Sequence, residues 1–221
     1  MDAKIGNQPS SKVMSVEEIT SLMQEGELGA MLDFTVTDKD GKIISNVTKK
    51  AESYVQQFLQ LMLINMLPTY VNGFVVPGTF LNTSGAGTNP VRDGSIFNVA
   101  AASNDPTYGI VVGIGTTAVT ITDYALETPI AHGTGSGQLQ YGGVSFGAPS
   151  ANITTSQLTI TRNFANNSGG SITVNEIALY CQCNTYGGLC RYMIIRDVIA
   201  GGIVVANGQT LTVNYRPQAA I

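Results

Sequence analysis

Three cysteines near the C-terminal end of the chain have the spacing that best suits chemistry: Cys181, Cys183 and Cys190. With a fourth ligand from elsewhere they could hold zinc, but the two-residue spacing of a zinc knuckle is absent. In an extended strand Cys181 and Cys183 point to the same side. A Cys183–Cys190 disulfide that closes the loop 184–189 is easier to form. The sequence therefore favours this disulfide, or reduced thiols, over a bridge between subunits and over a metal site.

The carboxylates of the C-terminal part and the single histidine are the other candidates for catalysis. Asp123, Glu127 and Glu176 would have to flank a cleft to hydrolyse a glycoside, and nothing in their spacing indicates one. We expect them to pair with arginines inside the fold, because isolated buried charges are costly; the candidates are Arg162, Arg191 and Arg196. His132 lies in a Gly/Ser loop without a nucleophile motif, which indicates an ordinary loop residue. We predict no catalytic residue, no cofactor and no metal, and thus no enzyme.

The segment that must position these side chains is centred on residues 109–130, GIVVGIGTTAVTITDYALETPI. Its apolar start predicts a strand at 109–112, and the alternation at 118–122 predicts a second one. Gly113 and Gly115 indicate a turn between them, where glycine adopts positive φ at little cost. A phosphate-binding loop is not indicated, because no Gly-Lys-Ser/Thr follows and the next residues are β-branched.

The composition is poor in charge for a chain of 221 residues. Charged residues make up 12 % of it, about half the usual share, and the net charge of -4 suggests neither a nucleic-acid partner nor an anionic membrane surface. Nine of the 15 acidic residues lie in the first 52 positions, so the remaining 169 carry six acidic and five basic side chains. A surface so poor in charge favours burial against neighbouring subunits. The alternative is a secreted β domain with an uncharged polar coat.

No apolar segment resembles a secretory signal or a membrane span. The N-terminus is polar, and the longest apolar run, Phe58–Leu67, is interrupted by Gln60 and Asn65 and is too short to cross a bilayer. We therefore expect synthesis in a cytosol and no membrane partner.

Residues 1–68 predict an N-terminal appendage made of an arm, a short helix, a β-hairpin and a long amphipathic helix. Residues 1–12 form the arm, and a capping box of Ser15 and Glu18 begins the short helix at 16–24. The alternation over 31–46 is interrupted by Asp-Lys-Asp-Gly, which favours a hairpin turn over a calcium loop because the downstream acidic ligands are missing.

The long helix is expected to start at Ser45 or Thr48 and to end before Pro68. Its last two turns are apolar nearly all round, so two faces must be covered. One face can lie on a sheet. The other is covered either by another subunit or by this chain's own core. The candidate interface residues are Phe58, Leu61, Met62, Ile64 and Met66.

Residues 69–108 read as an irregular connection rich in Gly, Pro and Asn, with strands at 73–76 and 95–101. Such a connection is typical of a functional excursion or of an arm that orders on assembly. Residues 109–221 predict at least six strands separated by turns, which is typical of an antiparallel β-sandwich or jelly roll. The sandwich either begins there or is continuous with residues 30–68. The fold class is therefore mainly β.

Several segments carry a family resemblance. They are Tyr108–Ile130, Arg162–Tyr180 (RNFANNSGGSITVNEIALY), Arg196–Ile199, Asn207–Tyr215 and the helical SYVQQFLQL of 53–61. They resemble structural proteins of tailed bacterial and archaeal viruses, over about residues 33–66 and 105–216. The resemblance implies a virion component rather than an enzyme. The loop between Cys181 and Cys190 and residues 69–100 lie outside the pattern, so no site is transferred to them.

These observations predict a virion structural protein that is synthesised in the host cytoplasm and assembles on the capsid, neck or tail. Its partners would be copies of itself and other virion proteins. One alternative is a receptor- or glycan-binding module at the tip of a fibre, which would bind glycan as an isolated domain. Another is an extracellular, pilus-like filament subunit joined by strand exchange. That alternative needs an N-terminal arm that pairs with the next subunit, and residues 1–12 are hardly apolar enough.

Overall fold

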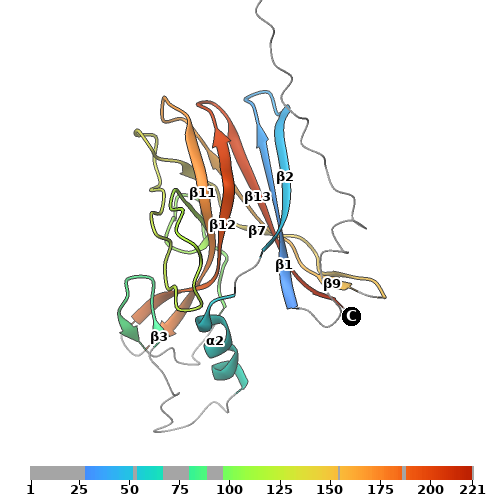
Figure 1. Ribbon diagram of the computed structural model, residues 1–221, viewed down its shortest axis with the longest axis vertical. Coiled ribbons are helices and arrows are strands. Elements are labelled where there is room, and N and C mark those ends of the chain that lie inside the picture. Colours follow the sequence, from blue (N-terminus) through green and yellow to red (C-terminus); the bar gives the residue numbers. More distant parts are fainter. Residues whose placement is uncertain are drawn as a thin grey trace, which may run out of the picture.

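The computed structural model describes residues 28–51, 54–66, 80–88, 97–153, 155–185 and 188–220. Within them the chain is mainly β, and every strand ladder is antiparallel (Figure 1). The predicted N-terminal segment of residues 1–12, the short helix at 16–24 and the strand at 73–76 lie outside the described residues.

The larger sheet has the order β2–β1–β13–β10–β6, with β7 also paired to β10 and with β8 joined through β9 to β13. Its strands are β1 (Leu28–Thr37), β2 (Ile43–Ala51), β6 (Gln140–Tyr141), β7 (Ser145–Phe146), β8 (Ser150–Ala151), β9 (Thr155–Gln157), β10 (Ile160–Ala165) and β13 (Thr210–Ala220). The smaller sheet has the order β12–β11–β5, formed by β5 (Gly109–Gly113), β11 (Ile172–Thr185) and β12 (Gly188–Val205). A separate pair is made by β3 (Phe80–Leu81) and β4 (Gly87–Thr88).

The predicted β1–β2 hairpin is present, with its turn at the Asp-Lys-Asp-Gly sequence. The Asp38 carboxylate accepts hydrogen bonds from the backbone amides of Asp40 and Lys42, at 2.9 and 3.0 Å, and Gly41 has a φ of +79°. However, β1 pairs with β13 over ten residues, from Leu28↔Ala219 to Thr37↔Thr210. The hairpin is thus an integral part of the larger sheet, which corrects the expectation of an appendage.

Alternation explains why the hairpin joins the sheet. Leu32, Phe34 and Val36 are buried on one face of β1, because successive side chains of a strand point to opposite faces. They belong to one continuous apolar cluster that also contains residues of β5, β10, β11, β12 and β13. Residues 30–51 and the C-terminal strands therefore share a single core.

The two sheets also meet through a buried polar contact. Asp197 of β12 accepts a hydrogen bond from the Tyr215 hydroxyl of β13 at 3.3 Å, and its carboxylate lies 4.0 Å from Lys49 Nζ of β2. The same ammonium donates to the Val198 carbonyl at 2.9 Å. The middle of β12, the edge strand of the smaller sheet, thus contacts the larger sheet.

The helix α2 (Gln56–Met66) starts later than predicted. The residues expected to begin it form β2 instead, because Val47 and Thr48 are β-branched and pair with Phe34 and Asp33 of β1. The chain then binds the edge of β12, where the Val55 amide donates to the Ile194 carbonyl at 3.2 Å. Only after this contact does the helix begin.

Two predicted strands are wrong. Residues 118–122 are irregular, although they alternate in sequence. In the described part of 95–101 there is only an isolated bridge between Asn98 and Gln182. The strand at 109–112 is confirmed, as β5, with all five residues of the strand buried.

Candidate functional site

Residues 97–220 contain nine charged side chains, of which four are buried, four are half-buried and one, Glu127, is exposed. They are Asp105, Asp123, Glu127, Arg162, Glu176, Arg191, Arg196, Asp197 and Arg216. Two buried arginines organise most of them, and each holds a long loop against a sheet.

The first arginine, Arg196 on β12, is bound by two carboxylates. Its Nε and Nη2 atoms donate to Glu176 Oε2 at 3.1 and 3.0 Å, and Nη1 donates to Asp123 Oδ2 at 2.7 Å. Nη2 also donates to the Thr117 carbonyl at 3.1 Å. The expected pairing of carboxylates with an arginine inside the fold is confirmed at this site.

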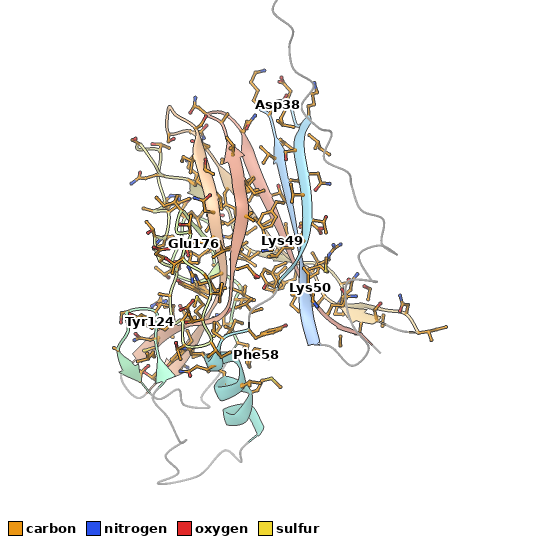
Figure 2. All side chains as sticks on the ribbon, viewed as in Figure 1. Asp38, Lys49, Lys50, Phe58, Tyr124 and Glu176 are labelled. Atoms are coloured by element: carbon orange, nitrogen blue, oxygen red, sulfur yellow. The ribbon has the colours of Figure 1, made fainter. Side chains whose placement is uncertain are left out.

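Glu176 fastens the loop 114–128, which we call the anchored loop. The residue is fully buried, and its carboxylate accepts hydrogen bonds from the amides of Gly115, Glu127 and Thr128. The Tyr180 hydroxyl accepts a further one from the Leu126 amide at 2.6 Å. Figure 2 shows Glu176 within the body of the molecule. With both oxygens engaged and no exposed surface, Glu176 is placed to hold the loop rather than to meet a substrate.

The other two carboxylates of this group tie the loop to itself. Asp123 accepts from the Thr120 amide and hydroxyl, at 3.0 and 2.6 Å. Burial by itself raises the pKa of Asp123, but the hydrogen bonds from Thr120 and Arg196 outweigh it and lower the pKa below its usual value. Glu127 accepts from the Thr116 and Thr117 amides, both at 2.9 Å, and the bond from Thr117 is the main cause of its lowered pKa.

Gly113 and Gly115 are needed here for a reason other than the predicted one. Neither has a positive φ. A Cβ at either position would instead lie 2.5 Å from Glu176 Oε1. These glycines let the backbone approach a buried carboxylate, so the expectation of a positive-φ turn is corrected.

The second arginine, Arg162 on β10, is bound by backbone carbonyls. Nε donates to Gly142 O at 2.8 Å, and Nη1 donates to Tyr108 O and Ile110 O at 2.8 and 2.9 Å. Nη2 donates to the carbonyls of Ala102 and Asp105. These five acceptors form what we call the carbonyl cage. Arg162 was expected to pair with a carboxylate, and this expectation is wrong within the described residues.

Aromatic rings cover the same guanidinium. Its carbon lies 4.8 Å from the centre of the Tyr141 ring and 6.0 Å from that of Phe164. Burial lowers the pKa of Arg162 below its usual value. Alternation in the sequence could have revealed this site, because Ile160, Arg162 and Phe164 fall on the same, buried face of β10.

The three cysteines lie together on one face of the β11–β12 hairpin. Cys181 is opposite Tyr192 and Cys183 is opposite Cys190 in the antiparallel register. The sulfur atoms of Cys181 and Cys183 are 3.7 Å apart, so the prediction that they point to the same side is confirmed. All three are thiols in the structure; of the two states that the sequence favoured, a Cys183–Cys190 disulfide or reduced thiols, it contains the second.

The predicted interface residues on α2 divide into two kinds. Leu61 is fully buried in this chain's own core, so it is not open to a second subunit. Phe58 is half-buried and packs on Tyr54, with the ring centres 4.2 Å apart. Met62 is also half-buried. The side chains of Ile64 and Met66 lie outside the described set.

His132 has the role of an ordinary loop residue, as predicted. Its Nδ1 accepts a hydrogen bond from the Tyr141 amide at 3.1 Å, and its backbone bridges to Leu139. Its ring rests edge-on against the Tyr141 ring.

With four of its nine charged side chains buried, this region presents a charge-poor outer surface with several exposed apolar side chains. Three of them lie on the anchored loop: Ile114, Ile121 and Tyr124. Tyr124 lies beside the β3–β4 turn (Figure 2). More lie on the segment 145–158, which we call the arm. The arm spans β7, β8 and β9 and contains no charged residue.

The arm is the most exposed apolar part of the described chain. Every residue from 145 to 153 is exposed, and Ile153 keeps 92 % of its side-chain and backbone surface open. The arm extends sideways from the end of β13, on the side away from the smaller sheet (Figure 1). Single exposed apolar residues are ordinary, whereas a run with Phe146, Ile153 and Leu158 and no charge is typical of a contact surface.

Two further observations concern metal binding and membrane spanning by the described residues. No group of three or more His, Cys, Asp or Glu side chains there is arranged to hold a metal ion. Nor does any helix in the same ranges have the length and apolar character to cross a membrane.

Comparison of the chain with protein-family models, with curated proteins and with solved structures found no match. The geometry above, together with the sequence, is therefore the ground for a functional proposal.

Proposed function

We propose that this protein is a structural subunit of a tailed-virus particle that folds as an antiparallel β-sandwich and packs against copies of itself and other virion proteins. The observation that carries the proposal is the charge-poor outer surface of residues 97–220, where four of the nine charged side chains are buried. Charged residues are depleted at the core of protein interfaces, because removing a charge from water is costly. A chain that binds its few charges internally has a surface that suits burial.

The arm supports the same proposal. An exposed, uncharged segment with three large apolar side chains exposes apolar area to water unless a partner covers it. The anchored loop adds a second surface with exposed apolar side chains, and Glu176 and Arg196 hold it in place. A rigid surface loses little conformational entropy on association.

The free sheet edges favour lateral packing over strand exchange. Within the described residues β2 is an edge strand that carries Lys50, and a lysine on an edge strand opposes pairing with another chain. The edge of β12 is interrupted by a bulge in which Gly201 and Gly202 have positive φ. Its other end is occupied by backbone bonds from Val55 and Thr83. These features weigh against the pilus-like alternative.

The first test is the mass of the purified full chain in solution, measured by size exclusion with light scattering over a range of concentrations. We expect rings, trimers or larger assemblies. Ile153→Lys should weaken them, because a charge at the tip of the arm would have to be desolvated. Ile43→Lys is the matched control. Ile43 is also an exposed isoleucine, but it adjoins the charged β1–β2 turn. It should leave assembly unchanged.

A second test asks whether the protein is a component of virus particles. Virus particles released by cells that carry the gene would be purified on a density gradient and analysed by mass spectrometry for peptides of this chain. Peptides that co-sediment with particles support the proposal. A stable monomer that binds glycans and is absent from particles would overturn it in favour of a receptor-binding module.

A further inference from the structure

We propose that Cys183 and Cys190 form a thiol–disulfide exchange site that closes the end of the β11–β12 hairpin when the chain meets a small-molecule disulfide such as oxidised glutathione. The inference does not depend on the proposed function, because it concerns three side chains of this chain and one class of oxidant.

The register supplies the first argument. Cys183 and Cys190 are directly opposite in an antiparallel ladder, where facing Cα atoms are about 4.5 to 5.5 Å apart. A disulfide spans Cα separations of about 4.4 to 6.8 Å. The two strands are already held in position by pairing on both sides, from Gln182↔Arg191 to Thr185↔Gly188. Closing the bond therefore needs side-chain rotation rather than strand movement.

Accessibility supplies the second argument and assigns the roles. Cys190 is half-buried, whereas Cys181 and Cys183 are buried. A soluble oxidant therefore reaches Cys190 first. Thr185 Oγ1 lies 3.7 Å from Cys190 Sγ, so the half-buried thiol lies beside the last residue of β11. Cys183, opposite it and beneath it in the fold, is then the resolving thiol.

Cys181 is the third thiol of the cluster and is the least suited to react. Cys181 and Cys183 are two residues apart on one strand, so their Cα atoms are about 6.6 Å apart, near the upper limit for a disulfide. The side-chain hydrogen bond with Cys183, and after it burial, raises the pKa of Cys181 and keeps it protonated. We expect it to remain a thiol after oxidation.

The exchange is balanced in two steps. The Cys190 thiolate attacks one sulfur of oxidised glutathione, forming a mixed disulfide and releasing one glutathione thiolate, which takes up a proton. The Cys183 thiolate then attacks Cys190 Sγ and releases the second glutathione. Two protein thiols are oxidised and one glutathione disulfide is reduced to two thiols.

The test incubates the full-length protein with oxidised glutathione, blocks remaining thiols with an alkylating agent and maps disulfides by peptide mass spectrometry. We expect a Cys183–Cys190 cross-link, a fall from three titratable thiols to one in denaturant, and a higher Tm. Reduction with dithiothreitol should reverse all three.

Serine variants separate the roles. Cys181→Ser should still form the cross-link, whereas Cys183→Ser should stop at a stable glutathione adduct on Cys190. Cys190→Ser should lose both adduct and cross-link. Each variant is first compared with the parent by thermal unfolding, and the adduct on Cys183→Ser reports the chemistry even if its Tm is lower. A Cys181–Cys183 cross-link, a disulfide between chains, or no reaction at Cys190 would overturn the proposal.

Discussion

The two buried arginines hold neighbouring loops by different means. Arg162 donates to five backbone carbonyls, whereas Arg196 donates mainly to the carboxylates of Glu176 and Asp123. The carbonyl cage depends on the path of the backbone and on no other side chain. The Arg196 site depends on two further side chains, each of which can be substituted or protonated. Substitutions at the two sites therefore distinguish stability that depends on the path of the backbone from stability that depends on particular side chains.

The largest effect should follow from removing the arginine of the carbonyl cage. Arg162→Met would leave five carbonyls without their donor, and at about 1 kcal/mol for each lost bond we expect the free energy of unfolding to fall by about 4 to 5 kcal/mol. The measurement is urea denaturation. No second side-chain substitution should restore the loss, since the acceptors are backbone atoms.

Arg216→Met is the control for this substitution. Arg216 forms an ion pair with Asp33 at 2.8 Å on a partly exposed part of the larger sheet. We expect its loss to cost about 1 kcal/mol or less. Equal effects at Arg162 and Arg216 would contradict the role given to the carbonyl cage.

The Arg196 site should show a smaller loss that a second substitution can repair. Arg196→Met leaves the buried Glu176 carboxylate without its cation and should cost about 3 to 4 kcal/mol. Glu176→Gln removes that charge, so the double variant should be more stable than the sum of the two single losses predicts. Strict additivity in a double-mutant cycle would show that the two groups do not interact.

A further prediction concerns the glycine that approaches Glu176. Gly115→Ala puts a methyl group 2.5 Å from Glu176 Oε1 and should cost about 1 to 3 kcal/mol through overpacking. Gly170→Ala is the matched control, because nothing lies within 4 Å of a Cβ there. If both variants unfold at the same urea concentration as the parent, the close approach has no energetic weight.

The smallest effect should be a difference in acid sensitivity. The pKa of Asp123 is lowered from its usual 3.8 in the folded state, so its carboxylate contributes stability above that pH. The contribution is lost as the pH falls through the lowered value. Asp123→Asn should therefore be less stable than the parent at neutral pH and should lose less stability on acidification. Parallel curves of unfolding free energy against pH would contradict this.

The sequence indicated those features that depend on local pattern. The apolar run at 109–112 indicated β5, and the Asp-Lys-Asp-Gly turn indicated the β1–β2 hairpin. The pairing of Asp123 and Glu176 with an arginine also followed, from the cost of isolated buried charges. Each of these rests on neighbours in the sequence or on a general energetic rule.

The errors have a common cause in tertiary contacts. The alternating residues 118–122 do not form a strand, because the Thr120–Asp123 hydrogen bonds and the Arg196 guanidinium hold them in an irregular loop. The helix begins at Gln56 rather than near Thr48 because β1 recruits those residues into β2. The partners of Arg162 could not be anticipated, since its acceptors are carbonyls of residues from 102 to 142 that only the fold brings together.

The position of β13 has a consequence for how the chain reaches its native state. This strand lies between β1 and β10 in the larger sheet, so residues 28–37 find their partner only among residues 210–220. On a ribosome the first described strand must wait for the last one, and pairings so distant along the chain slow folding. Until then β1 and β2 form a two-stranded hairpin with an uncovered apolar face. Completion of the sheet therefore waits until residues 210–220 have been made, and chains that still lack them are the form most exposed to aggregation or to chaperone binding.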